Sequence, residues 1–158
     1  MSELHEVRLA GFPLALHARA QEHHEELMRE FQLLALSSPS AGVPQRLVAL
    51  VEELTTSFGG FTSVPNAARD AAAERGEDTI DLTYQVPPSA AAAATRLDAM
   101  LDEADEYCRA GERLLTMAAP DDVAALRHWQ LAEFAAQLGG AAPTPWAEWS
   151  ARRALTTG

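Results

Sequence analysis

The chain has 158 residues, of which 47% are apolar, and its 23 acidic and 12 basic residues give a formal net charge of −11. This length is typical of one domain with a sizeable core, and the ordinary apolar fraction excludes wholesale disorder. Every basic residue is an arginine, which excludes a Schiff-base lysine and a P-loop lysine, and the acidity disfavours nucleic acid and anionic membranes as partners.

Two amphipathic helices and a shorter one are predicted in the first half of the chain. The first covers residues 13–36, where apolar side chains recur on one face at helical spacing. After the turn-forming stretch SSPSAGVP, the second helix begins near Pro44 and ends at Gly59 and Gly60. An alanine-rich helix follows over residues 64–75. The predicted core-facing residues of the first two helices are Leu16, Ala20, Leu27, Phe31, Leu34, Leu47, Leu50, Val51, Leu54 and Phe58.

Residues 80–86 change the period of the pattern from helical to alternating, which is typical of a half-buried strand. The apolar positions are Ile80, Leu82, Tyr84 and Val86. A strand needs a hydrogen-bonding partner, and the comparable stretch is EVRLAGF near the N-terminus. Pairing of these two segments, pairing across a dimer, and an extended segment lying across the helices are all open at this point.

Two further long helices are predicted, over residues 89–110 and residues 121–138, each ended by glycine. Their apolar faces hold Leu97, Met100, Leu101, Ala104, Cys108, Val123, Leu126, Leu131, Phe134 and Leu138. A proline-broken stretch with two tryptophans closes the chain. We therefore expect an all-α fold, a compact bundle of four main helices with a short extended segment, as a domain over residues 1–146 with a flexible tail over residues 147–158.

The single cysteine, Cys108, excludes a disulfide framework within the chain and favours a reducing cytoplasm. It lies on an apolar helix face near the helix end, so a core position is expected rather than a reactive thiol. The acidic N-terminus and the interruption of the following apolar stretch by Arg8, His17 and Arg19 indicate neither a signal peptide nor a spanning helix. The sequence predicts a cytoplasmic protein.

An acidic stripe and two tryptophans are the candidate interaction residues. Asp98, Asp102, Asp105 and Glu106 lie roughly opposite the apolar face of their helix, and we expect them to form a docking surface for a basic protein partner. A hard-cation site is disfavoured because Arg109 interrupts the stripe and no EF-hand pattern is present.

The tryptophans allow two arrangements. Trp129 lies roughly opposite the apolar centre of its helix, so with Trp146 and Trp149 it forms either an exposed aromatic interaction patch or a folded-back arrangement in which Trp146 covers Trp129.

The stretch QEHHEELMREF raises the question of chemistry at His23 and His24. No H-E-x-x-H or Glu-x-x-His spacing is present, so a metal site would need His24, Glu25 or His17 together with a residue from another helix, such as His128. A phosphoacceptor role would use His24 with Glu25 as a base, in a helix that faintly resembles the H-box helix of histidine kinases. That box's usual proline is missing, and the chain has no glycine-rich ATP-binding half. The third interpretation is that the histidines are scaffold at the edge of the core.

Four stretches, ARAQEHHEELMREFQLLAL, DLTYQVPP, MLDEADEYCRAGERLL and PTPW, resemble a family of small, all-helical actinobacterial proteins. The family is associated with genes for serine-kinase-type anti-sigma factors, their antagonist domains and PP2C-type phosphatases. The resemblance covers nearly the whole chain and brings no catalytic motif. It implies a regulatory context. We therefore expect a non-enzymatic regulatory or adaptor protein without a cofactor, which binds a protein partner such as an ATPase-type anti-sigma module, and the helical faces leave a homodimer open.

Overall fold

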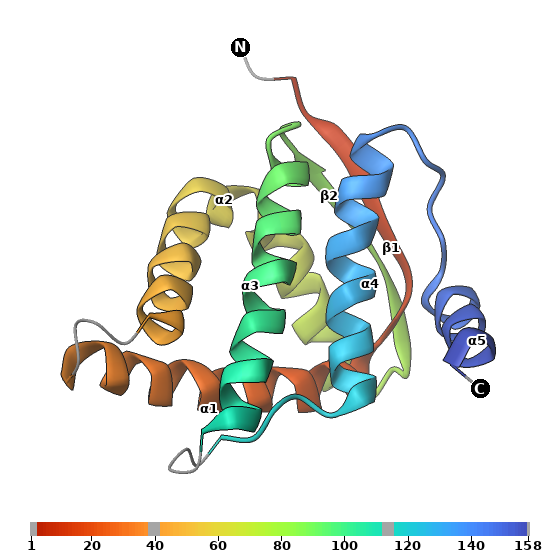
Figure 1. Ribbon diagram of the computed structural model, residues 1–158. Helices are drawn as coiled ribbons and strands as arrows, with labels where there is room; N and C mark the ends of the chain where they lie inside the picture. The colour runs from red at the N-terminus through yellow and green to blue at the C-terminus, as the bar shows by residue number, and fades with distance from the viewer. Residues whose placement is uncertain (1–2, 38–41, 112–115, 158) are drawn as a thin grey trace.

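The computed structural model describes residues 3–37, 42–111 and 116–157, and within them the chain forms five helices and two strands (Figure 1). In chain order the elements are β1 (His5–Pro13), α1 (Leu14–Ser37), α2 (Val43–Glu74), β2 (Thr79–Val86), α3 (Ala90–Ala110), α4 (Asp121–Leu138) and α5 (Trp146–Thr157). The predicted all-α bundle of four main helices is therefore correct only as a mostly helical fold, because the described residues also form a sheet and a fifth helix. Residues 38–41 of the predicted turn lie outside the described residues.

The two strands pair with each other in an antiparallel sheet, which is one of the three arrangements that the sequence left open. The buried partners across the ladder are Val7 with Tyr84 and Leu9 with Leu82. The register shifts between Leu9 and Phe12, where Gly11 has a φ of 65°. Glycine is favoured at such a bulge because it adopts positive φ without a steric penalty. The Gly11 N–H donates to Asp81 Oδ1 over 2.8 Å, which holds the bulge against β2.

Helix α2 runs through Gly59, Gly60 and Pro65, so the predicted separate helices over residues 44–58 and 64–75 are one element. Figure 1 shows that the helix changes direction along its length, and glycine pairs and prolines are the usual causes of such bends. The bend lets the first half of α2 pack against α1 and α3 through Leu47 and the second half pack against the sheet through Ala72. The burial of side chains in both halves of α2 outweighs the unfavourable free energy of glycine in a helix, which is about 1 kcal/mol per glycine.

Replacing Gly60 with alanine is expected to raise the free energy of unfolding by about 0.5–1 kcal/mol, because alanine loses less backbone entropy in a helix. Gly60 is exposed and a Cβ there would contact no atom within 4 Å. Urea unfolding measures the change. The control is Gly76→Ala, which should be destabilising because Gly76 caps α2 with a φ of 77°. A loss of stability in both variants would contradict a continuous α2.

The core has two parts. One part lies between the sheet and α4, with Phe12, Leu126 and Trp129 fully buried, and the other lies between α1, α2 and α3, with Phe31 and Leu47 fully buried. The residues predicted on the apolar faces of the four long helices are buried or partly buried, so these helix-face predictions are confirmed. The placement of Trp129 opposite the apolar centre of its helix is wrong, because Trp129 is fully buried.

Helix α5 packs against β1 and α4, and Figure 1 shows it on the side of the molecule where β1 lies. It begins at Trp146, so residues 147–157 of the predicted flexible tail are helical. The division into a domain over residues 1–146 and a tail over residues 147–158 stays a prediction. Across the described residues, no helix combines the length and apolarity that a membrane crossing requires.

Candidate functional site

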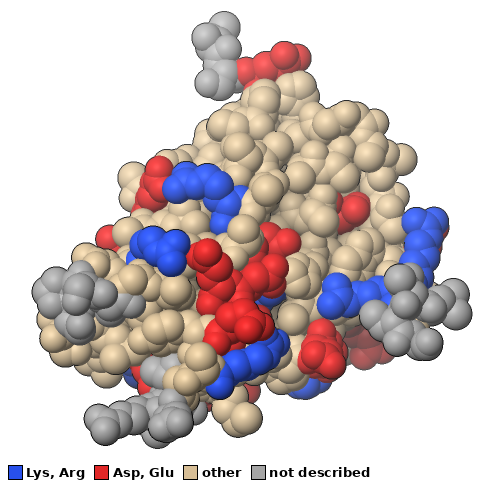
Figure 2. All heavy atoms as spheres, in the orientation of Figure 1, with Lys and Arg blue, Asp and Glu red and all other residues tan. Residues whose placement is uncertain are grey.

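Most of the acidic stripe of α3 faces α4. Figure 2 shows acidic side chains gathered over α3, with arginine side chains beside them. Asp98, Asp102 and Asp105 contact Arg127 and His128 of α4. These five residues are called the α3–α4 polar cluster below.

Arg127 binds all three carboxylates of the cluster. Its Nη2 donates to Asp102 Oδ1 over 2.6 Å, its Nη1 to Asp105 Oδ2 over 3.1 Å and its Nε to Asp98 Oδ1 over 3.4 Å. The side chain of Arg127 is 16% exposed and that of Asp105 is 6% exposed, so solvent screens this pair weakly. The planar guanidinium offers five N–H donors, which suits it to several carboxylates at once. Arg127 therefore holds α3 against α4.

Asp105 and Glu106 have different surroundings, although the sequence placed both on an exposed stripe. Asp105 is buried, and its Oδ1 accepts a hydrogen bond from the Ala119 backbone N–H over 3.1 Å. Asp105 therefore binds two groups at once: the backbone of Ala119, just before α4, and the guanidinium of Arg127. Glu106 stays exposed and pairs with Arg109 one helical turn away. Asp98, Asp102 and Asp105 are already paired within the protein, because Arg127 and His128 bind them, and the predicted docking surface over these residues and Glu106 stays a prediction.

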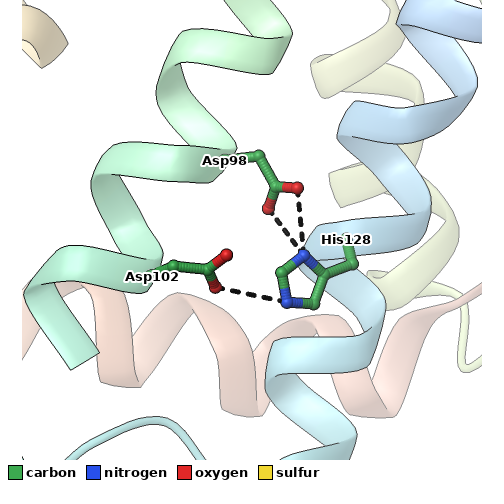
Figure 3. Close-up of side chains that lie close together, drawn as sticks. All are labelled: Asp98, Asp102 and His128. Atoms are coloured by element: carbon green, nitrogen blue, oxygen red, sulfur yellow. Dashed lines mark hydrogen bonds and ion pairs between the residues drawn. The ribbon is translucent and has the colours of Figure 1, made fainter. Parts of the chain in front are cut away.

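His128 completes the cluster from the α4 side (Figure 3). Its Nδ1 lies 2.8 Å from Asp98 Oδ1, so the hydrogen bond places a proton on Nδ1. Its Nε2 lies 3.3 Å from Arg127 Nη2 and 3.3 Å from Asp102 Oδ1. Both ring nitrogens of His128 therefore have a polar partner within the cluster.

Asp98, Asp102 and His128 are also the group that could hold a metal ion within the described ranges, because one ligand atom of each lies within 4.8 Å of the others. The guanidinium of Arg127 already supplies the cation at Asp102 Oδ1. A divalent cation would have to displace that group, so the geometry favours a structural role for the cluster. Arg127 was not singled out from the sequence, although an arginine beside His128 on the neighbouring helix is the counter-charge that the acidic stripe needs.

The three histidines of α1 are not part of this cluster. His23 Nε2 lies 2.9 Å from the backbone oxygen of Met117, which is the scaffold bond expected for a histidine at the core edge. His24 faces two neighbouring cavities, one of which also contacts His17. Neither His17, His24 nor Glu25 joins His128 in a metal-binding group within the described part of the chain, so the metal site predicted around His24 is not assembled.

Burial lowers the pKa of both His17 and His24. For His17 the pKa falls from 6.5 to about 4, chiefly because of burial and next because of the Arg69 guanidinium. For His24 burial also has the largest effect, followed by the charge of His23, while Glu25 opposes them. Both imidazoles are therefore neutral at neutral pH.

The lowered pKa of His17 predicts that the protein loses stability as the pH falls from about 6.5 to about 4. In that range the unfolded chain protonates His17 and the folded chain does not, so proton binding favours unfolding. After allowance for the partial exposure of the ring, His17 accounts for about 1–2 kcal/mol of the loss. Urea unfolding of His17→Gln should show a shallower decline over this range. The control is His5→Gln, near the N-terminus, and an identical decline in all three proteins would contradict the prediction.

The tryptophans adopt the folded-back arrangement. Trp129 is fully buried, with its ring centroid 5.6 Å from that of Trp146, and Trp146 stacks on Trp149 at 5.9 Å. The Trp129 Nε1–H donates to the Thr144 backbone oxygen over 2.8 Å. Trp129 therefore contributes to the core and not to an exposed interaction patch, and Trp146 covers it.

Cys108 is buried on the core face of α3, as predicted. Burial is the main reason that the pKa of its thiol rises to about 11, and the carboxylates of Asp105 and Glu30 add to the effect. The thiol stays protonated at neutral pH and is a poor nucleophile.

Comparisons of the chain with models of protein families, with curated proteins and with solved structures gave no significant match. Its function is therefore argued from the residues and their geometry.

Proposed function

We propose that the chain is a non-enzymatic regulatory or adaptor protein that acts through protein–protein contacts. The observation that carries this proposal is the outer face of α1, which comprises Glu22, Glu25, Glu26, Arg29, Leu33 and Leu36. Helical spacing places these side chains within one arc of the helix, and all of them are exposed. Leu33 is 64% exposed and Leu36 is 83% exposed. An exposed leucine pair beside a run of acids is typical of a surface that a partner covers.

The chemistry of this face favours a partner with a basic amphipathic helix. Apolar residues of such a helix would cover Leu33 and Leu36, while its arginines or lysines would meet the glutamates. Two copies of the chain would place these acidic faces against each other, so charge repulsion disfavours a homodimer through α1. The family resemblance makes an ATPase-type anti-sigma module the first partner to test.

The outer face of α1 replaces the α3 stripe as the proposed docking surface. Three of the four stripe acids bind Arg127 or His128, and of the four only Glu106 points away from α4. Met117, which is 80% exposed, also lies beside α1, because its backbone oxygen bonds to His23 and the neighbouring Thr116 bonds to Glu26 and Glu30.

Binding of purified candidate anti-sigma modules, measured by calorimetry, tests this proposal. The double variant Leu33→Ser/Leu36→Ser should bind at least about tenfold more weakly, since an interface leucine removed from contact costs about 1–2 kcal/mol. The control is Val64→Ser, which changes an apolar residue that is 78% exposed on α2. Equal affinity of the wild-type and double-variant proteins would reject the α1 surface, as would equal weakening by Val64→Ser.

The second candidate function is phosphoacceptance by His24. Its lowered pKa keeps the imidazole neutral, which is the form whose nitrogen attacks phosphorus. Against it, the ring faces two open cavities whose walls come mostly from other elements, and not the outer face of α1. Incubation with candidate histidine kinases should yield acid-labile phosphate that is absent in His24→Gln and present in His23→Gln. Labelling that persists in His24→Gln would reject this function.

A further inference from the structure

An open cavity of about 470 Å³ lies between α2, β2, α3 and α4, with His24 of α1 also in its wall, and none of the residues of the α1 docking surface lines it. It is called the α2–α3 cavity below. Residues of α2 from Val51 to Arg69 contribute to its wall, so the helical segments before and after Gly59 and Gly60 both line the cavity. Gly59 is one of these wall residues, and a Cβ added there would contact no atom within 4 Å, so a larger side chain at this position has room to enter the space. Cavities of roughly 300–1,000 Å³ with mostly apolar walls are the usual size of small-molecule sites.

Most of the wall is apolar. The apolar side chains that face the space come from three helices and β2, and include Leu54, Phe58, Val86, Leu97, Leu131 and Phe134. Binding of an apolar group against such a wall is favoured by roughly 25 cal/mol for each Å² of apolar surface that is removed from water. It therefore favours an occupant with an apolar body.

Three polar side chains of the wall are joined to one another. Asn66 Oδ1 accepts a hydrogen bond from Arg69 Nη1 over 3.2 Å and one from the Tyr84 hydroxyl over 3.4 Å. Burial raises the pKa of Tyr84, so its hydroxyl stays protonated and remains a donor. The three side chains together form one polar corner in an otherwise apolar wall.

Arg69 gives this corner a positive charge. Its side chain is 16% exposed, and its neighbour Asp70, which accepts from Nε and Nη2, is 68% exposed. The bonds to Asn66 and Asp70 use three of the five guanidinium N–H groups. The others, one on each Nη, can donate to a pair of ligand oxygens, as arginine does with carboxylates.

We propose that the α2–α3 cavity binds a small amphipathic carboxylate. The carboxylate accepts hydrogen bonds from Arg69 and lies beside Asn66 and Tyr84, while the apolar body lies among Phe58, Leu97 and Phe134. One arginine matches the single charge of a carboxylate. The negative charge of the chain as a whole disfavours anions elsewhere on its surface.

Calorimetric titration of the full chain with octanoate and with octanol tests the proposal. These probes share an apolar body and differ in charge. The wild-type protein should bind octanoate at least about tenfold more tightly than octanol, because a charge-assisted hydrogen-bonded pair is worth more than a neutral contact. Binding of neither probe, or equal binding of both, would overturn the proposal.

Two pairs of variants locate the site. Gly59→Leu fills the cavity and should abolish binding of both probes, whereas Gly60→Leu, at the exposed neighbouring position, should bind as the wild type does. Arg69→Gln should lose the preference for octanoate and keep octanol binding, whereas Arg75→Gln, an exposed arginine at the end of α2, should keep the preference. If Gly59→Leu does not fold, Ala93→Leu fills the same space from α3, with exposed Ala92→Leu as its control. A preference for octanoate that survives in Arg69→Gln, or binding that survives in the filled cavity, would overturn the proposal.

Discussion

Replacing Arg127 with methionine is expected to lower the free energy of unfolding by about 3 kcal/mol, because removal of one partner of a buried ion pair leaves unpaired charges behind. Methionine keeps much of the side-chain length and removes only the donors and the charge. Asp98, Asp102 and Asp105 would then face one another without the guanidinium, and the carboxylate of Asp105 is buried. Urea unfolding monitored by circular dichroism measures the change.

Two further variants distinguish this effect from the general loss of an arginine. Arg96→Met removes an exposed arginine whose pair with Glu53 is more than half exposed on both sides, and it should change stability by no more than about 0.5 kcal/mol. The double variant Arg127→Met/Asp105→Asn should recover part of the loss, because the buried carboxylate charge is gone. Additive effects of the two substitutions would contradict the coupling of Arg127 and Asp105 that we infer.

Replacing Trp129 with alanine is expected to cost about 4 kcal/mol, since large core residues leave cavities that the surroundings fill only in part. Trp129 is fully buried and contacts Phe12 of β1 and Trp146 of α5. Its loss also leaves the Thr144 carbonyl without the indole donor. The same variant should therefore increase hydrogen exchange of the α5 amides, because α5 packs on this indole through Trp146.

The control for Trp129 is Trp149→Ala. Trp149 is partly exposed and stacks on the outer side of Trp146, so its removal should cost only about 1 kcal/mol. Equal losses in the two variants would show that burial of Trp129 does not determine the stability of this end of the molecule. Unchanged α5 exchange in Trp129→Ala would contradict the proposed attachment of α5 through Trp146.

Patterns of apolar and capping residues within short segments predict the helices of this protein, because the spacing of apolar residues in each helix reflects which of its faces is buried. The apolar spacing that ends in Phe31 and Leu34 predicts α1 to within one residue, and Gly76 marks the end of α2 through a glycine cap. The same reasoning predicted an alternating strand over residues 80–86 and a buried Cys108. These predictions need only neighbours within a few residues of each position.

Contacts between residues that lie far apart in the sequence could not be predicted from these short-range patterns. Gly59 and Gly60 are a helix stop by local rules, yet α2 continues because its two halves bury side chains in different parts of the core. The tertiary structure likewise decides the role of the acidic stripe, since helical spacing places Asp105 opposite the apolar face without showing that Arg127 lies there.

The sequence by itself determined a mostly helical domain, the faces of its long helices, a strand that needs a partner and the absence of any lysine chemistry. Only the tertiary structure decided that β1 pairs with β2, that Trp146 covers Trp129 and that His24 faces cavities instead of joining His128. The physical reason is the range of the interactions. Periodicity and capping act over one or two helical turns, whereas strand pairing, buried ion pairs and cavities depend on which segments far apart in the chain come together.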